Sequence, residues 1–373
     1  MSIKKVGLSI LRGVLNEIEI QKWLNKNISL KKDTLFIENK KISLPKNGKA
    51  ILICTGKSAS SLAYAFQKKL NKKIKHTYIF SPKKYYKKYP LKKTTTYLGT
   101  HPKINKKTLK NTESFLNKIE NHKKTDFYIF LISGGTSSSI EKLKKHISLK
   151  KYNQLINEMI FSGQSINKIN RIRTSLSEVK GGKILKFFKK NIIFGLYISD
   201  VPTNDFYTIG SGLTAVQNKA KKTFENVKNI MIADYKTALV ILKRQIKNYR
   251  FNLHEISKPI DEDAMLLSKK IANLVHRQGS KPFAISWCGE SRIAVKTHLR
   301  GGRNLHLTLL MANALKNFKR PFFFVSYATD NKDGTSPVGG AFLTHNVLKQ
   351  LSQNEVQKAL KKFNSYDYLN QKS

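Results

Sequence analysis

Four apolar segments of this chain end directly at small or polar residues whose side chains can bind or transfer charged groups. The residues that follow these segments are Gly56-Lys57-Ser58, Ser133-Gly134-Gly135-Thr136, Ser199-Asp200 and Thr329-Asp330. Short apolar segments bounded by turn residues are typical of buried parallel strands, and open α/β sheets bind ligands beyond the carboxyl ends of those strands. The four positions are therefore expected to line one cleft.

Lys57 is a candidate for binding phosphate because it lies between a predicted strand and a predicted helix. A point charge beside the amide groups that open a helix suits a phosphoryl group in transfer. The segment is not a P-loop, since Ile51 stands where that motif requires a glycine. The alternative is one more surface lysine in a lysine-rich chain.

A hydroxyl-rich turn with two glycines follows the second apolar segment. Its residues Ser133, Gly134, Gly135, Thr136 and Ser137 precede a predicted helix start, where backbone amides and hydroxyls form a nest for an anion. The alternative is a serine that only caps the helix. A cap does not need the glycine pair, so the pattern favours binding.

Arginine is scarce in this chain, where it supplies ten of the 70 basic residues. Where lysine is abundant, an arginine more often lies where a planar fork must hold a carboxylate or a phosphate. Half of the arginines occur in two segments rich in glycine or serine: Arg171, Arg173, Arg292, Arg300 and Arg303. Asn170, Arg173 and Ser177 have the spacing of one helix face, for which a solvated polar face is the alternative.

Two carboxylates flank a turn that contains Pro202. Asp200 and Asp205 could hold Mg2+ through its waters and the substrate, or accept a hydroxyl proton. The alternative for each is that its side chain caps its own turn.

The C-terminal part of the chain carries a second group of polar residues. Glu290 supplies a carboxylate, and Gly301-Gly302-Arg303-Asn304 carries a guanidinium on a flexible loop into a predicted helix. Asp330 adds a further acid at the end of the last apolar segment. Arg303 is thus the second cation expected at the cleft.

Apolar and amphipathic segments alternate through the first 200 residues. The predicted strands are 51–55, 76–81, 127–132 and 192–198, and the predicted helices are 8–26, 58–70, 106–121, 150–163 and 164–190, with a small hairpin at 34–43. This alternation predicts a doubly wound α/β sheet.

A polar, lysine-rich stretch at 215–229 separates these elements from a second set. The second set has predicted strands at 230–233, 251–256, 282–288, 292–297 and 322–328, and predicted helices at 234–247, 261–277 and 304–316. A chain of 373 residues is long enough for two cores. We therefore expect two domains, at residues 1–222 and 223–373.

The formal net charge of +47 would by itself suggest nucleic acid or an anionic surface as a partner. The accompanying excess of Lys, Asn and Ile is typical of A/T-rich codons, and the lysines are scattered between predicted elements. We therefore expect no specific nucleic-acid partner, although the Lys- and Tyr-rich stretch 83–93 could bind single strands. A positive field also attracts anionic small substrates and nucleotides.

No apolar stretch approaches the roughly 18 residues of a membrane span, and charged residues interrupt the first twenty positions. We therefore expect no membrane span, no signal peptide and a cytoplasmic location. Cys54 and Cys288 are the only cysteines, which predicts buried free thiols and neither a disulfide framework nor a zinc site.

Taken in order, these segments resemble the glycerate 2-kinase family, the class II glycerate kinases whose C-terminal part is the MOFRL domain. The resemblance covers nearly the whole chain, through Gly56-Lys57, Thr100-His101-Pro102, Ser133-Gly134-Gly135, Ser162-Gly163, Asn170 to Arg173, Lys180-Gly181-Gly182, Ser199 to Pro202, Asp205, Ser211-Gly212, Gly289-Glu290, Gly301 to Asn304, Asp330 and Asp333-Gly334. Each match is short, but their common order makes the combination specific.

The resemblance implies a Rossmann-like doubly wound larger domain, a smaller α/β domain with a mixed sheet and the MOFRL region at about 281–373, and a cleft between the domains. It implies ATP-dependent phosphorylation of the 2-hydroxyl of D-glycerate with Mg2+. Lys57 and Arg303 would stabilise the transferring phosphoryl, and Asp200 would orient Mg2+ or the hydroxyl. The residues expected to bind substrate or nucleotide are Ser133, Gly134, Gly135, Thr136, Ser137, Asn170, Arg173, Lys180, Asp205, Glu290, Gly301, Gly302, Asn304 and Asp330, with Asp200 or Asp205 as metal ligand.

The chain departs from the family pattern at several motif positions, namely Thr136, Thr203, Asn204, Cys288 and Asn331. Asn204 replaces an acid, and Thr136 alters the anion nest. Two alternatives therefore stay open beside glycerate phosphorylation. One is a kinase for another small hydroxy acid, and the other is an altered paralogue that only binds an anionic metabolite.

Overall fold

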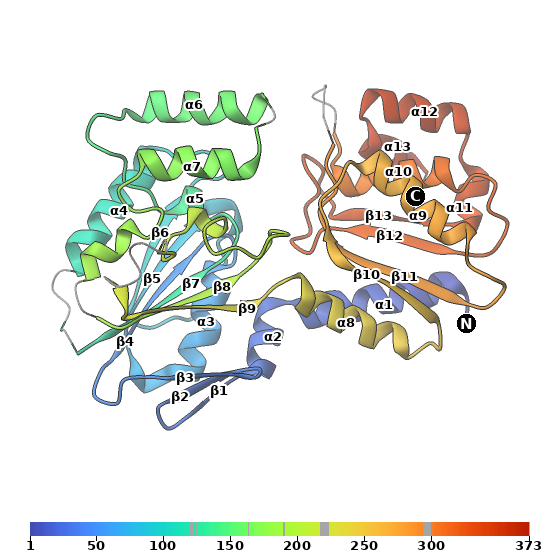
Figure 1. Cartoon of the computed structure of the whole chain (residues 1–373). Coiled ribbons are helices and arrows are strands. Elements are labelled where there is room, and N and C mark those ends of the chain that lie inside the picture. The colour runs from blue at the N-terminus through green and yellow to red at the C-terminus, as the bar shows by residue number, and fades with distance from the viewer. Residues whose placement is uncertain are drawn as a thin grey trace. The chain divides into compact units, whose positions relative to one another are not determined.

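The computed structural model describes residues 1–119, 123, 125–162, 164–188, 191–216, 224–293 and 300–372 (Figure 1). The chain divides into two compact units. The larger unit is Glu19–Asp234, and the smaller unit combines Met1–Ile18 with Tyr235–Ser373. Both ends of the chain thus belong to the smaller unit.

The larger unit is built on six parallel strands in the order β6-β5-β4-β7-β8-β9. Their bounds are β4 Ala50–Thr55, β5 Ile74–Pro82, β6 Thr94–Gly99, β7 Phe127–Ile132, β8 Ile193–Ile198 and β9 Val227–Ala233. The first three strands extend the sheet in one direction and the next three in the other, which is the strand order of the Rossmann fold. The predicted doubly wound α/β class is confirmed.

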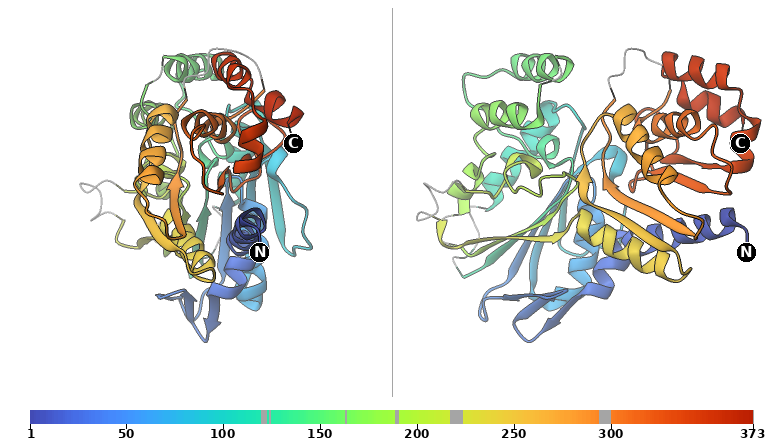
Figure 2. Two further views of the ribbon diagram at one scale, coloured as in Figure 1. Left: turned by 90° about the vertical axis from the view of Figure 1, so that its right-hand side faces the viewer. Right: turned by 45° about the vertical axis from the view of Figure 1, so that its right-hand side comes forward.

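Helices on both faces of this sheet explain why its central strands are continuously apolar (Figure 2). Every residue of β4 and β7 is buried. Phe188 of the 3₁₀ helix η3 (Lys183–Phe188) packs edge-on against Tyr128 and Phe130 of β7, and Phe115 of α4 (Lys106–Ile119) packs against Phe188. Other α-helices of the larger unit are α3 (Ala59–Leu70), α5 (Thr136–Ser139), α6 (Leu149–Phe161) and α7 (Ile166–Leu176).

The prediction that residues 230–233 begin the second domain is wrong. β9 pairs in parallel with β8, with Ile193 opposite Val227, and forms the edge of the larger unit's sheet. An apolar segment shows that a strand forms but does not show which strand it joins. The structure divides between Asp234 and Tyr235, whereas the predicted boundary at 222/223 lies outside the described residues.

The predicted helix 8–26 is two helices, α1 (Ile3–Ile18) and α2 (Ile20–Asn27). Glu19 separates them because its carboxylate accepts hydrogen bonds from the backbone N–H groups that open α2. α1 packs against α8 (Tyr235–Lys247), where Glu17 forms an ion pair with Arg244. This packing is the reason that α1 belongs to the smaller unit and not to the predicted domain 1–222.

The predicted helix 164–190 also ends early, at Leu176. Gly181 and Gly182 then have left-handed φ values of +64° and +77°, which interrupt the helical path before η3. The predicted hairpin at 34–43 is confirmed as β2 (Thr34–Ile37) and β3 (Lys40–Ser43), joined by β1 (Ile28–Lys31) in an antiparallel sheet. Strand β6 was not predicted, because its sequence TTTYLG is weakly apolar.

The smaller unit contains one parallel and one antiparallel strand pair. β10 (Asn252–Ile260) pairs in parallel with β11 (Phe283–Gly289), and β12 (Phe323–Tyr327) pairs antiparallel with β13 (Gly340–Thr344). Its other helices are α9 (Ala264–His276), α10 (Arg303–Ala314), α11 (His345–Gln350), α12 (Gln353–Lys362) and α13 (Ser365–Gln371). The predicted strand 292–297 lies mostly outside the described residues.

α10 is the central helix of the smaller unit, since eight consecutive residues from Leu305 to Ala312 are buried. Across the described residues, no helix is long and apolar enough to cross a membrane. Both cysteines are free thiols, and Cys54 is buried while Cys288 is partly exposed. Burial raises the pKa of the Cys288 thiol to about 11.

Candidate functional site

The loops after β4 and β7 lie side by side at the point where the strand order of the sheet reverses. Doubly wound sheets bind ligands at this switch point. The Lys57 amide donates to the Gly134 carbonyl oxygen at 2.8 Å, and the Ser58 amide donates to the Ser133 hydroxyl at 3.2 Å. That hydroxyl in turn donates to the Thr55 carbonyl at 3.0 Å. Ser133 therefore joins the two loops.

The glycine pair lets side chains approach the backbone of the second loop closely. A Cβ atom at Gly134 would lie 1.7 Å from a carboxylate oxygen of Asp200. A Cβ atom at Gly135 would lie 3.1 Å from Cγ of Lys57, and the φ of +85° at this residue also favours glycine. The fold thus brings together Lys57, Gly134, Gly135 and Asp200. These are residues that the sequence predicted to line one cleft, and all four belong to the larger unit.

Two aromatic rings that the sequence analysis did not assign to the site lie beside Lys57. The Lys57 ammonium is 5.4 Å from the ring centroid of Tyr85, and the Tyr85 ring lies perpendicular to His101 at 6.1 Å. Tyr85 closely follows β5, and His101 closely follows β6. Both residues could have been selected from the sequence because each lies just beyond the carboxyl end of a strand of the same sheet.

A chain of hydrogen bonds connects the glycine turn to α7. The Ser137 and Ser211 hydroxyls are 2.9 Å apart, and Ser211 donates to Oδ1 of Asn170 at 3.0 Å. Arg173 donates to the same oxygen at 3.4 Å, and the Asn170 amide donates to the Thr208 carbonyl at 3.2 Å. Asn170 and Arg173 thus lie on one face of α7, as predicted. The predicted third member of this face, Ser177, lies beyond the end of the helix at Leu176, where its backbone is extended.

Lys180 is completely buried and forms an ion pair with Glu141, whose side chain is also fully buried. Ser177 donates a second hydrogen bond to Glu141, and the Tyr152 hydroxyl lies 3.4 Å from the Lys180 ammonium. Removing one partner of such a pair leaves an uncompensated buried charge. We therefore assign Lys180 to the framework that holds the loops.

The acids after β8 differ in their surroundings. Both oxygens of Asp205 are used within its own turn, since they accept from the Tyr207 amide and the Thr208 hydroxyl at 3.1 Å each. Asn204 donates to Asp234 at 2.6 Å. Asp200 is exposed and packs against Gly134. Asp205 therefore matches the alternative of a turn cap, and Asp200 is the better placed carboxylate.

Among the described residues, no group of three or more His, Cys, Asp or Glu side chains could hold a metal ion. Mg2+ usually binds through one or two carboxylates together with substrate phosphates and water. The exposed carboxylate of Asp200, which lies against the glycine turn, fits that mode of binding. A site made only of protein ligands does not fit the described part of the chain.

Four of the predicted residues of the smaller unit meet at the start of α10, namely Glu290, Gly302, Arg303 and Asn304. Arg303 is exposed and forms an ion pair with Glu290. Asp333 caps the helix, because its carboxylate accepts from the amides of Asn304 and Leu305 at 3.1 and 2.8 Å. A Cβ atom at Gly302 would lie 2.3 Å from Asp333. Burial raises the pKa of this carboxyl, while the amide hydrogen bonds oppose the shift.

The other predicted residues of this unit have local contacts. The Gly301 amide donates to the Thr335 hydroxyl at 3.2 Å, and Asp330 is exposed and accepts from the Lys332 amide at 3.3 Å. The predicted grouping of Arg303 with Lys57, Ser133 and Asp200 joins residues of both units and stays a prediction. Gly163, which belongs to the family resemblance, lies outside the described residues.

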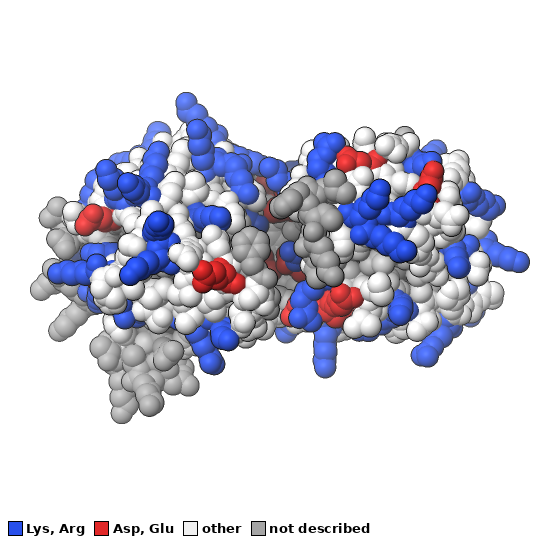
Figure 3. Space-filling view, turned by 90° about the horizontal axis from the view of Figure 1, so that it is seen from above, with Lys and Arg blue, Asp and Glu red and all other residues white. Residues whose placement is uncertain are grey.

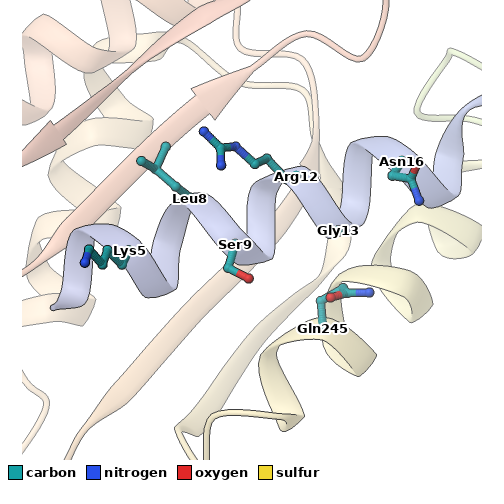
Figure 4. A pocket seen from close by; sticks show the side chains of 7 residues that line it. All are labelled: Lys5, Leu8, Ser9, Arg12, Gly13, Asn16 and Gln245. Atoms are coloured by element: carbon teal, nitrogen blue, oxygen red, sulfur yellow. The ribbon is translucent and has the colours of Figure 1, made fainter. Parts of the chain in front are cut away.

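An open groove of about 680 Å³ lies on α1 and α8 of the smaller unit (Figure 4). It is lined by Lys5, Leu8, Ser9, Arg12, Gly13, Asn16 and Gln245. None of these residues was predicted as a site residue, and the two cations are exposed. The groove is therefore separate from the predicted site residues.

Basic residues are spread over the whole face that Figure 3 shows, with few acids between them. They do not form one continuous patch in this view. This distribution agrees with the expectation of a generally solvated basic surface.

Two family models match the chain. They are "Domain of unknown function (DUF4147)" over residues 7–280 and "MOFRL family" over residues 283–373. A D-glycerate 2-kinase of Thermotoga maritima is 28% identical over 368 residues, which cover 88% of this chain and 87% of that protein. A glycerate 2-kinase of Picrophilus torridus is 27% identical over 287 residues, which cover 69% of each.

Solved structures show the same fold. A crystal structure of a glycerate kinase from Thermotoga maritima matches with a TM-score of 0.83 and 25% identity, over 99% of this chain and 94% of its own. A crystal structure of a protein from Pyrococcus horikoshii matches with a TM-score of 0.79 and 22% identity, over 99% and 93% of the two chains.

Proposed function

The chain belongs to the DUF4147 family and carries a MOFRL domain at its C-terminal end, and on this premise we propose that it is an ATP-dependent kinase that phosphorylates the 2-hydroxyl of glycerate. One observation carries the proposal. Lys57, the glycine pair and Asp200 meet at the switch point of a Rossmann-ordered sheet. The glycerate kinases among its relatives supply the expected substrate.

Phosphoryl transfer depends mainly on positioning and charge stabilisation, which this loop arrangement can supply. A bond forms between the acceptor hydroxyl oxygen and the γ-phosphorus, while the bond from that phosphorus to the ADP oxygen breaks. In the proposed mechanism Lys57 contacts the transferring group, and the backbone at Gly134 and Gly135 admits the phosphates closely. Asp200 orients the hydroxyl and accepts its proton.

Arg173 is the proposed fork for the acceptor carboxylate within the larger unit. It donates to Asn170, and the hydroxyls of Ser211 and Ser137 continue this chain to the glycine turn. A guanidinium has five N–H donors, so this contact is compatible with a bidentate carboxylate. Arg303 of the smaller unit is the alternative fork, or the second cation for the phosphoryl.

Asp200 is also the residue that would hold Mg2+, together with phosphate oxygens and water. Bound there, Mg2+ would neutralise charge on the phosphates. The proposal for Asp200 thus has two forms, as metal ligand or as acceptor of the hydroxyl proton.

The test is an assay of the purified chain with ATP and Mg2+ against a panel of 2-hydroxy acids that includes both enantiomers of glycerate. We expect ADP formation with D-glycerate, and a ³¹P spectrum of the product that places the phosphate on the 2-hydroxyl. Turnover with a different hydroxy acid alone would replace glycerate as the acceptor. ADP formation with none of them, beside tight binding of the acids, would favour an anion-binding paralogue.

A further inference from the structure

The face of the Tyr85 ring contacts two lysine side chains, those of Lys57 and Lys84. The residue ends the 3₁₀ helix η2 (Lys83–Tyr85), directly after β5. The Lys57 ammonium lies 5.4 Å from the ring centroid, and the Lys84 ammonium lies 4.9 Å from it. An ammonium within about 6 Å of an aromatic centroid is attracted by the ring quadrupole.

The Tyr85 ring packs in turn against His101, which lies beside the glycine turn. His101 lies perpendicular to Tyr85, with an interplanar angle of 85°. A Cβ atom at Gly135 would be 3.3 Å from the His101 ring and 3.1 Å from Cγ of Lys57. Side chains from the loops after β4 and β6 therefore approach one glycine of the loop after β7, and Tyr85 from the loop after β5 lies against both of those side chains.

We propose that Tyr85 is a positioning residue that holds the Lys57 ammonium in the geometry that phosphoryl transfer requires, an inference that rests on the proposed function. A lysine side chain has four flexible methylene groups, and its ammonium is a mobile point charge. A ring face that is fixed by His101 restricts this motion before the substrate arrives. The ring acts through Lys57 and touches neither the acceptor nor the nucleotide.

The first test compares Tyr85→Phe with Tyr85→Leu. Phenylalanine keeps the aromatic face, so we expect kcat within about threefold of the parent, whereas leucine should lower kcat by about three- to thirtyfold with little change in KM for the acceptor. A matched control is Tyr64→Leu, because Lys68 lies 4.5 Å over the Tyr64 ring in the same way. Equal losses in Tyr85→Phe and Tyr85→Leu would overturn the proposal.

The second test places Tyr85→Leu in a Lys57→Ala background. Because the ring acts through the ammonium, the double variant should be no slower than Lys57→Ala alone. A further loss of the size seen in the single Tyr85→Leu variant would show that Tyr85 acts on the ligand directly, which would overturn the proposal.

The third test needs no turnover and so separates this inference from the proposed function. The folded chain is labelled briefly with an amine-specific reagent, and peptide mass spectrometry compares the labelling rates of Lys57 and Lys68. We expect Tyr85→Leu to speed the labelling of Lys57 severalfold and to leave Lys68 unchanged, and Tyr64→Leu to do the reverse. Unchanged labelling of Lys57 in folded Tyr85→Leu would refute the positioning role, whatever the kinase assay shows.

Discussion

Lys57 and Arg303 are the single residues whose loss should slow turnover most. Preorganised charge at a developing transition state is worth about 3 kcal/mol, so Lys57→Ala and Arg303→Ala should each lower kcat by about a hundredfold or more. Arg303→Lys should also be slow if its fork geometry matters. Steady-state assays with ATP and D-glycerate measure the effect.

The control for this residue-level prediction is Lys68→Ala, since Lys68 is an exposed lysine in the last turn of α3. This variant removes the same charge from the far end of the helix that follows Lys57. Turnover close to the parent in Lys57→Ala would exclude Lys57 from the mechanism.

At the scale of elements, the close approach of the loops after β7 and β8 depends on Gly134. An added methyl group at this residue would overlap the Asp200 carboxylate and force it to move. Displacement of a catalytic group by about 1 Å can cost a hundredfold in rate, so Gly134→Ala should lower kcat by about ten- to hundredfold without unfolding the chain. Kinetics and circular dichroism of the same preparation provide the measurement.

Gly279→Ala is the matched control, because a Cβ atom at Gly279 would meet nothing within 4 Å. It should keep both activity and fold. If Gly134→Ala also keeps full activity, Asp200 does not need its observed position, and its proposed role fails.

The cap of α10 gives a second prediction at this scale. Asp333→Ala leaves the amides of Asn304 and Leu305 without their acceptor, so the free energy of unfolding of the smaller unit should fall by about 1–3 kcal/mol. Trp287 lies in β11 of this unit, and a Trp23→Phe background leaves it as the single tryptophan. Urea denaturation followed by its fluorescence measures the change.

Asp330→Ala serves as the comparison for this cap. Asp330 is exposed and accepts a hydrogen bond from the nearby Lys332 amide, so it caps no helix. We expect its urea midpoint to stay within error of the parent. A midpoint equally unchanged in Asp333→Ala would show that the cap contributes nothing to the stability of this unit.

At the scale of the whole molecule, the net charge of +47 should produce weak and unspecific binding to DNA. If about six phosphates are neutralised, affinity should fall by roughly 10³-fold or more between 50 and 200 mM salt, because condensed counterions are released. Binding titrations with DNA duplexes of unrelated sequence should give equal affinities. Sequence-selective binding at physiological salt, without phosphorylation of any hydroxy acid, would make the basic surface the functional one.

The amino-acid sequence by itself determined the central strands and the chemistry of their ends. β4, β7 and β8 are continuous apolar segments because parallel strands are covered on both faces, and this pattern is local. Lys57, Gly134, Gly135 and Asp200 could be selected for the same reason, since each closely follows one of these strands. The family resemblance then supplied an expected activity and substrate.

Only the tertiary structure decided which distant segments meet. β9 joins β8, Tyr85 and His101 lie beside Lys57, and Lys180 pairs with Glu141 across 39 positions of the chain. None of these partners follows from a local pattern, because each depends on strand order and on the packing of loops that are far apart in sequence. The physical reason is that periodicity reports whether a residue is buried, whereas the identity of its neighbour is fixed by the packing of the whole unit.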